Sequence, residues 1–557
     1  MASTLGSADE STVAFDIIVV GGGTAGCALA SRLSQFRPTL SIALIERGPD
    51  ETEHHQVVNP QAAPLLPQTN LVVDYKTSSQ TQLDDRNVSN FAGRLLSGSS
   101  AANYGAWMRA PASDYDLWAQ HVGDPQWNYQ NLLPYFRRTE HHYDIQGDKK
   151  QHGFEGPIHT TSRGVYPLRE AVHQIFTKSG FRDIPDTSAG AGVAPWVENW
   201  RDGNRQHSSK VFGLSSVQVI TNALVTQIVL NGDKVATGVK LADGRHLRAK
   251  KEVIISCGAH KTPQLLMLSG IGPAEELRKN RIELLVNSPA VGSNHFDHLS
   301  LHQAWKLRHP ERGLAAGSPA FNRPEYGQGF PVEWIATYSV PSSALSKSLS
   351  IAASDQVSLL SSQSHVFPDR THLGLLIAYA PINVNEDYDV PLDGSHVSSG
   401  VLLFQPTSRG SITLTSDNPI AEPVVNPQYY STLADKEMLR SGVRRVAELM
   451  ESSAGREILE HETPPRGMPA LTSSASDEDI DARARAYSEV WHHSGGTTAM
   501  GKDILTSVVD SQFRVHGVQG LRVVDAGALP APISATPQAT VYAMAEVAAD
   551  LISKSVS

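Results

Sequence analysis

Cysteine is almost absent from this chain, since its 557 residues contain only Cys27 and Cys257. Two thiols cannot complete a four-ligand zinc site, and we expect no metal centre. Cys27 follows a glycine turn and Cys257 ends an apolar run, so we expect free, packed thiols rather than a disulfide.

Long apolar runs and an excess of positive charge are also missing. No run approaches the ~18 to 20 apolar residues of a membrane-spanning helix. The formal net charge of −10 disfavours nucleic acid and anionic membranes as partners. Residues 1–12 lack the basic and apolar segments of a secretory signal, so we expect a cytoplasmic enzyme that acts on a small molecule. The oligomeric state stays open.

The length is too great for a single hydrophobic core, and hydrophobic residues at 40% are typical of soluble globular proteins. The strongest local pattern is in residues 15–48. An apolar run is followed by a glycine turn, a helix pattern and a second apolar run that ends in Glu46. The turn has the spacing G-x-G-x-x-G, through Gly21, Gly23 and Gly26, and Glu46 follows the last glycine by 20 residues. This arrangement predicts a bound dinucleotide, with its phosphates at the helix N-terminus and a ribose at the acid.

Three later segments add to this pattern. Residues 93–103 form a second turn of small residues, where backbone can lie against a ligand. Residues 249–257 predict a strand that leads into residues 258–272, where Thr262 would cap a helix whose first residue is Pro263. From about 300 to 425, short alternating runs separated by Pro, Ser, Asp and Gly predict an antiparallel sheet.

Together these segments resemble the glucose–methanol–choline (GMC) family of FAD oxidoreductases, along nearly the whole chain. The resemblance is carried by the N-terminal glycine motif, GRLLSGSSAANYGAW, residues 258–272, VGSNHFDH at 291–298 and the C-terminal HSGGTTAMG, VVDAGALP and YAMAEVAADLI. It implies a mixed α/β and α+β fold, in which a Rossmann-like, discontinuous FAD domain is interrupted by a substrate domain with helices and a large antiparallel β-sheet. The expected FAD-domain segments are 14–160, 211–300 and 491–557, with a connecting region at 161–210 and the substrate domain at 301–490.

The resemblance also implies where FAD would lie. Glu46 would bind the adenosine ribose and Val225 would reach the adenine through its backbone. The family's covalent type uses a histidine near residues 97–103, and this chain has none there, so we expect non-covalent attachment. The residues expected around FAD are Gly21, Gly23, Thr24, Ala25, Gly26, Glu46, Arg47, Arg94, Ser97, Ser100, Asn103, Tyr104, Gly105, Ala106, Val225, Cys257, Gly258, Asp525, Ala526, Gln538, Ala539 and Thr540.

Hydride transfer from an alcohol needs a base for the hydroxyl proton, and histidine suits this task. By resemblance, His493 stands at the family's active-site histidine. The family's second position, usually His or Asn, aligns with Thr536, or with Gln538 if the register slips by two residues. Thr536 cannot act as a base at neutral pH, and His492 either faces the pocket or packs.

We therefore expect an FAD-dependent oxidoreductase that oxidises a CH–OH group of a specialised small molecule, with His493 as acid/base and a role in secondary metabolism. The altered second position keeps an alternative open. In that alternative, the flavoprotein catalyses a redox-neutral cyclisation, dehydration or lyase reaction.

Overall fold

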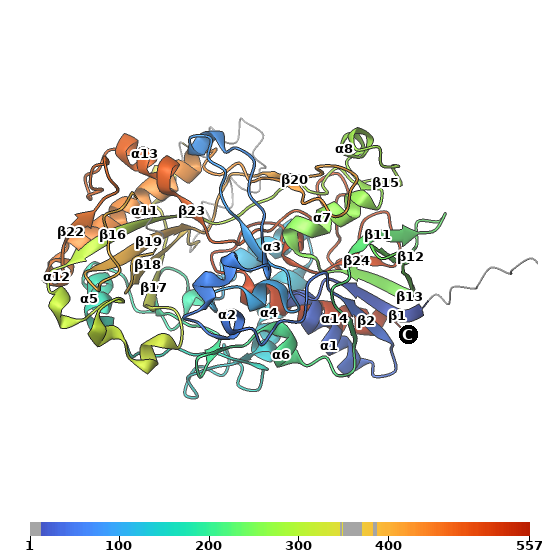
Figure 1. Cartoon of the computed structure of the whole chain (residues 1–557), viewed down its shortest axis with the longest axis horizontal. Coiled ribbons are helices and arrows are strands. Elements are labelled where there is room, and N and C mark those ends of the chain that lie inside the picture. The colour runs from blue at the N-terminus through green and yellow to red at the C-terminus, as the bar shows by residue number, and fades with distance from the viewer. Residues whose placement is uncertain (1–12, 346–347, 349–369, 383–386, 557) are drawn as a thin grey trace, which may run out of the picture.

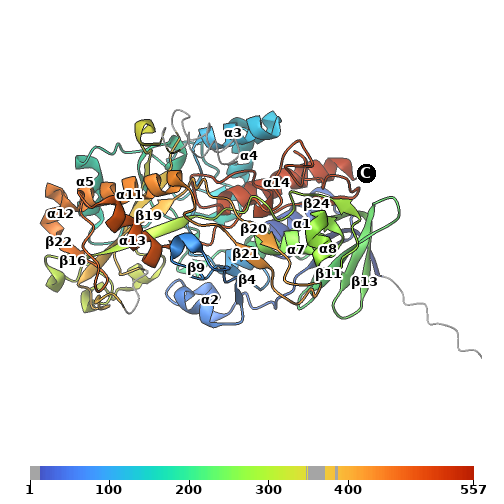
Figure 2. The same cartoon turned by 90° about the horizontal axis from the view of Figure 1, so that it is seen from above.

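Figure 1 shows a computed structural model of the chain, which describes residues 13–345, 348, 370–382 and 387–556. Two seven-stranded sheets lie toward opposite ends of the long axis in both views (Figures 1 and 2). Within the described residues, we find no helix that is both long and apolar enough to cross a bilayer.

The first sheet has the order β10-β2-β1-β13-β12-β11, with β24 paired to the end of β13. Its parallel strands are β10 (Gln218–Ile220), β2 (Ile42–Ile45), β1 (Val13–Val20), β13 (His246–Ile255) and β24 (Leu521–Val523). β12 (Ala236–Leu241) and β11 (Val225–Leu230) continue it in the antiparallel sense. The central residues of β1 and β2 are fully buried, as expected for strands with both faces covered.

Helices α1 (Thr24–Phe36) and α14 (Gln538–Ser555) pack against each other beside this sheet. α7 (Gly258–Leu268) follows β13 and contacts β11. The cap expected at Thr262 is wrong, because α7 begins at Gly258 and the Thr262 hydroxyl donates instead to Asp525 Oδ2 at 2.6 Å. Thr262 thus bonds to a residue 263 positions away in the chain instead of capping the helix locally.

The second sheet is antiparallel throughout. Its strands, in order, are β22 (Leu459–Thr463), β16 (Leu299–Leu307), β19 (His396–Leu403), β18 (Leu373–Ala378), β17 (Val332–Tyr338) and β7 (Gly192–Pro195), with β23 (Glu489–Val490) also paired to β16. α11 (Leu433–Glu451) lies on it through Leu439, Val443 and Val446, and Gly442 allows close approach, since a Cβ there would lie 2.5 Å from Val401.

The predicted fold class is confirmed. The strands of the first sheet come from 13–45, 218–255 and 521–523, and those of the second come from 192–195 and 299–490. Further helices are α2 (His55–Val58), α3 (Ala112–Val122), α4 (Tyr129–Thr139), α5 (Arg169–Lys178), α6 (Ser208–Phe212), α8 (Ala274–Lys279), α12 (Ser453–Ile458) and α13 (Asp477–Tyr487). Short strand pairs are β3 (Val72–Asp74) with β4 (Phe91–Gly93), β5 (Glu140–His141) with β6 (Ile158–His159), β8 (Trp200–Arg201) with β9 (Asn204–Arg205), β14 (Ile271–Gly272) with β15 (Val286–Asn287), and β20 (Ser411–Thr413) with β21 (Val424–Asn426).

Candidate active site

A cavity of about 1410 Å³ is lined by residues that come from both sheets and from the loops between them. It is larger than the ~300 to 1,000 Å³ of a pocket for one small ligand, so it has room for a cofactor and a substrate together.

The glycine turn after β1 forms one wall of this cavity. Gly21 has φ +102°, and a Cβ there would lie 2.4 Å from Ser256 O; a Cβ on Gly26 would lie 2.0 Å from Gly21 O. A side chain at either position would clash with the backbone, so these two glycines allow the close backbone packing. Gly23 differs, because the nearest atom to its Cβ position is 3.9 Å away. With Thr24 and Ala25 it lines the cavity at the N-terminus of α1, where free N–H groups and the helix dipole favour an anion.

Glu46 lies just past β2 and also lines the cavity. Its Oε2 accepts a hydrogen bond from Gly22 N–H at 3.0 Å and its Oε1 accepts one from Gly48 N–H at 2.8 Å. Burial raises the pKa of Glu46, and these backbone donors oppose that effect. Each carboxylate oxygen keeps a further lone pair, so the side chain can accept hydrogen bonds from ligand hydroxyls.

Next to Glu46, Arg47 and Lys261 line the same end of the cavity, and Glu422 outside the lining pairs with both. Glu422 is 3.1 Å from Arg47 Nη1 and 2.8 Å from Lys261 Nζ, and Arg47 also donates to the Tyr75 hydroxyl at 2.7 Å. Sequence reasoning missed Lys261, Glu422 and Tyr75, because no local motif predicts that these segments meet.

Most of the residues expected around FAD line the cavity: Gly21, Gly23, Thr24, Ala25, Glu46, Arg47, Asn103, Tyr104, Gly105, Ala106, Val225, Cys257, Gly258, Asp525, Ala526 and Gln538. Six others do not line it, and their contact with FAD stays a prediction: Gly26, Arg94, Ser97, Ser100, Ala539 and Thr540.

Other contacts account for these six residues. Gly26 serves packing, as described above, and Ala539 is fully buried in α14. Arg94 donates to Asn70 O at 2.8 Å. The Ser97 hydroxyl donates to Ser209 Oγ at 2.7 Å and the Ser100 hydroxyl donates to Ser97 O at 2.7 Å. The Thr540 hydroxyl is 2.8 Å from the Tyr115 hydroxyl.

His493 lines the cavity close to the start of β16. Its backbone N–H donates to Asp297 Oδ1 at 2.7 Å, and its Nδ1 lies 2.9 Å from Nδ1 of His298. Burial lowers the pKa of His493 well below its ordinary value. The ring is therefore neutral at pH 7, which leaves one ring nitrogen able to accept a proton.

The preceding residue, His492, faces the cavity rather than packing. Its backbone is left-handed, with φ +58°, which a non-glycine residue adopts only at a cost. Its Nδ1 accepts a hydrogen bond from Phe91 N–H at 3.1 Å, and burial lowers its pKa to about 4. A neutral ring that accepts at Nδ1 carries its proton at Nε2, so His492 is a hydrogen-bond donor at neutral pH.

Thr536 and Gln538 also line the cavity, and each directs one hydrogen-bond donor to the protein backbone. Both donate to Ala106 O, at 3.2 Å from the Thr536 hydroxyl and 3.1 Å from Gln538 Nε2. Gln538 Oε1 accepts from Asn103 and Asn199 at 3.0 and 3.2 Å. Gln538 thus joins three segments of the wall, and Thr536 can offer a ligand only its oxygen lone pairs.

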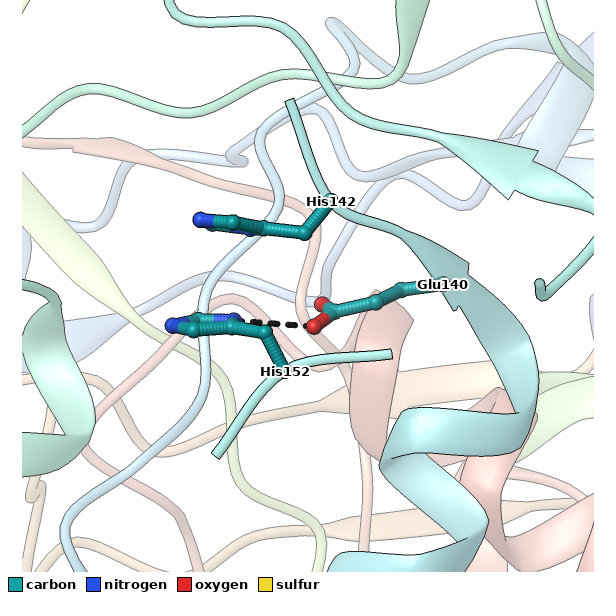
Figure 3. Close-up of side chains that lie close together, drawn as sticks. All are labelled: Glu140, His142 and His152. Atoms are coloured by element: carbon teal, nitrogen blue, oxygen red, sulfur yellow. Dashed lines mark hydrogen bonds and ion pairs between the residues drawn. The ribbon is translucent and has the colours of Figure 1, made fainter. Parts of the chain in front are cut away.

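A further cluster, Glu140, His142 and His152, lies outside the cavity lining (Figure 3). The figure shows the two imidazoles face to face, with the Glu140 carboxylate at the edge of His152. Glu140 accepts hydrogen bonds from Trp107 Nε1 at 3.2 Å, from His152 Nδ1 at 2.9 Å, from Gly153 N–H at 3.1 Å and from Arg109. These donors occupy the carboxylate lone pairs that a metal ion would need, so we interpret the cluster as an internal ion network.

Comparison with known proteins places this geometry in a family. Two models described as GMC oxidoreductase match residues 15–300 and 406–545. The chain belongs to the GMC oxidoreductase family. It is 42% identical to the GMC-type oxidoreductase acuG of Aspergillus aculeatus, over 97% of this chain and 99% of that protein. It is 31% identical to the dehydrogenase str4 of Strobilurus tenacellus, over 97% of this chain and 94% of that protein.

Among solved structures, the chain resembles a variant of the formate oxidase of Aspergillus oryzae that was studied for FAD modification. The TM-score is 0.86 at 26% identity, and the match covers 98% of this chain and 99% of that one. The protein is therefore an FAD-dependent oxidoreductase, as the sequence predicted.

The residues present fit FAD. The uncovered backbone at Gly23, the N-terminus of α1 and the acceptor oxygens of Glu46 suit a pyrophosphate and a ribose. Two lining residues, Ser256 and His260, have buried polar atoms, Oγ and Nε2, without a hydrogen-bond partner in the described chain. Buried polar atoms of this kind require a partner, which a polar ligand or water would supply.

Proposed function

We propose that this enzyme oxidises a CH–OH group of an uncharged, mainly aromatic small molecule to a carbonyl, with His493 as the base. FAD would lie with its pyrophosphate at Gly23 and Thr24, its ribose at Glu46 and its adenine at Val225. The chemistry that bound FAD supplies is acceptance of the hydride that leaves the alcohol carbon. The observation that carries the proposal is a neutral, cavity-facing His493 beside the donor His492.

The two histidines divide the work on the hydroxyl group. His493 takes the hydroxyl proton on its free ring nitrogen, which makes the ring an imidazolium. His492 Nε2–H donates a hydrogen bond to the same oxygen as negative charge develops there, and Thr536 Oγ accepts from a substrate donor. A positioned donor to a developing oxyanion accelerates such a step by ~10² to 10³, so His492 replaces the donor that the second family position lacks here.

The substrate end of the cavity indicates the class of alcohol. Tyr104, Trp196, Phe330 and Trp491 line it. Between residues 302 and 392, the described lining residues include no Asp, Glu, Lys or Arg. Glu489 also lines the cavity, but Arg86 is 3.3 Å from its carboxylate. A charged substrate beside residues 302–392 would therefore lack a free counter-charge, and burying an unpaired charge is costly. An aromatic ring with one hydroxyl group fits the lining better, because aromatic pairs prefer stacked or edge-to-face contacts.

Anaerobic stopped-flow spectroscopy of the holoenzyme tests the proposal. Benzyl alcohol should bleach the oxidised flavin band faster than glucose or choline does. Product that forms while the band stays oxidised would overturn the proposal in favour of the redox-neutral alternative.

The His493→Ala variant should keep FAD and lose ~10² to 10⁴ in turnover, while His461→Ala, at a side chain that is 61% exposed, should keep wild-type turnover. Equal activity of the two variants would remove His493 from this role.

Three finer points belong to the same proposal. FAD is held non-covalently, so acid precipitation should release it into the supernatant. The partner is a small molecule rather than nucleic acid or membrane, and the enzyme works in the cytoplasm in secondary metabolism. The net charge of −10 supports a small-molecule partner over nucleic acid or an anionic membrane.

A further inference from the structure

His298 is buried directly behind His493. It immediately precedes β16, its exposed fraction is 1%, and it does not line the cavity. The two rings are perpendicular at 89°, with centroids 5.0 Å apart, and their Nδ1 atoms are separated by 2.9 Å. This contact joins residues 195 positions apart in the chain.

The geometry of the histidine pair is held by one carboxylate. Asp297 Oδ1 accepts the backbone N–H of His298 and that of His493, both at 2.7 Å. Asp297 Oδ2 accepts from Asn90 Nδ2, Tyr429 OH and Ser494 Oγ at 2.7, 3.0 and 3.1 Å. Since both histidine backbones share one buried anchor, the rings have little freedom to separate.

A hydrogen bond between two Nδ1 atoms requires that one of them carries the proton. Burial lowers the pKa of His298 to about 3 and that of His493 well below its ordinary value, so both rings are neutral at pH 7. A neutral imidazole has one N–H and one lone pair. If His493 donates, its Nε2 keeps the lone pair and can act as a base. If His298 donates, His493 carries its proton on Nε2 and cannot.

The proposed role of His493 as a base selects the first arrangement, because only that one leaves a lone pair on its Nε2. Nε2 of His298 is buried without a hydrogen-bond partner in the described chain. The Phe404 backbone raises the pKa of His298 against the larger effect of burial, and the Phe404 ring meets the His298 ring at 63° with centroids 5.3 Å apart. In the first arrangement the Nδ1–H of His493 points to Nδ1 of His298, so the single proton of the neutral His298 ring is on Nε2. With its proton on Nε2, His298 must accept at Nδ1.

We propose that His298 is a positioning residue that accepts the Nδ1–H of His493 and thereby keeps the lone pair of His493 on Nε2, toward the substrate. The same contact stabilises the imidazolium that forms when His493 takes the hydroxyl proton. This inference rests on the proposed function of His493. A wrong tautomer costs ~10⁴ in a Ser-His-Asp triad, where the supporting group is charged; a neutral acceptor should contribute less.

Steady-state kinetics of two variants test this role. His298→Phe removes the acceptor and should lower kcat about 10²-fold, with KM changed less than about threefold and FAD still bound. His298→Gln restores an acceptor oxygen and should recover kcat to within about tenfold of wild type. The acidic limb of the kcat/KM profile should move to lower pH in His298→Phe, because the imidazolium loses its acceptor. Wild-type kcat in His298→Phe, or a His298→Gln that is equally slow, would overturn the proposal.

A second measurement does not depend on turnover. In ¹⁵N-histidine-labelled holoenzyme, the buried Nδ1–H of His493 should give a far-downfield proton resonance that is protected from exchange. It should vanish in both His298→Phe and His493→Phe and persist in His461→Phe. A resonance that survives in His298→Phe would overturn the inference. If instead no alcohol is oxidised while the resonance behaves as expected, the proposed function fails and the hydrogen-bonded pair stands.

Discussion

Asp297 should be the most sensitive structural residue of the active site. It is 2% exposed and accepts hydrogen bonds from two backbone N–H groups on Oδ1 and three side chains on Oδ2. Asp297→Ala leaves these donors unsatisfied in a buried site, at ~1 to 3 kcal/mol for each donor that finds no water. If water reaches about half of them, the loss of stability is ~4 kcal/mol, which is at the exceptional end for one substitution.

Asp297→Asn is the matched variant, and it should cost much less. Its amide oxygen can still accept hydrogen bonds from the two backbone N–H groups, which can act only as donors. Its NH₂ group then faces Asn90, Tyr429 and Ser494, and the two hydroxyls can turn to accept. Asn90 can also reverse its amide, because its Oδ1 has no hydrogen-bond partner in the described chain. We expect a cost of ~1 to 2 kcal/mol, the difference between charged and neutral acceptors.

Thermal unfolding followed by flavin fluorescence would measure both variants, and stopped-flow flavin reduction would measure the catalytic geometry. Asp297→Ala should unfold at a clearly lower temperature than Asp297→Asn, and the latter should keep measurable flavin reduction. Two variants with the same unfolding temperature, or an Asp297→Ala as stable as wild type, would refute the account of Asp297 as a shared anchor.

Three further predictions concern the rest of the site. Glu422→Gln removes the anion shared by Arg47 and Lys261, so FAD should dissociate ~3- to 10-fold faster and the rate should depend less on salt than in wild type. The surface variant Glu478→Gln should not change the dissociation rate. Unchanged dissociation in Glu422→Gln would contradict a role of these ion pairs at the adenosine end. The carboxylates of Glu140 and Asp186 raise the pKa of His152 to about 9, so its stabilising effect is complete below about pH 6.5 and is lost as pH rises through about 9. Between pH 7 and 10 the unfolding temperature should fall more steeply in wild type than in His152→Gln, and parallel curves would count against this network. Thr536→Val removes a hydroxyl that already donates to Ala106 O, so kcat should fall less than ~10-fold, and a loss of ~10³ would show that Thr536 acts directly on the reacting oxygen.

Several elements of the fold followed from local sequence alone. The β1-turn-α1 unit and the position of Glu46 depend on glycine conformations and on side-chain periodicity, both of which act over a few residues. The antiparallel sheet after residue 300 was predictable for the same reason, since alternating runs between turn residues repeat locally. The position of His493 in the cavity followed from a family motif rather than from physics that can be read along the chain.

Local sequence failed where long-range contacts compete with local ones. α7 begins four residues before the expected cap, and Asp525 Oδ2 accepts from both the Gly258 N–H and the Thr262 hydroxyl. The family resemblance, not local sequence, placed Ser97 at the cofactor; its hydroxyl donates to Ser209 Oγ, and its contact with FAD stays a prediction. Thr536 and Gln538 stay candidates for the position beside His493, and the sequence did not predict that both donate to Ala106 O.

The sequence by itself determined the dinucleotide-binding unit, the family and the identity of the candidate base, because each depends on residues adjacent in the chain. Only the tertiary structure decided which groups surround that base. The contacts of His493 with His298 and Asp297, and of Arg47 with Glu422, join segments separated by 195 to 375 residues. Hydrogen bonds act over about 3 Å in space and do not affect the local sequence pattern. Partners this distant in the chain can therefore be found only once the chain is folded.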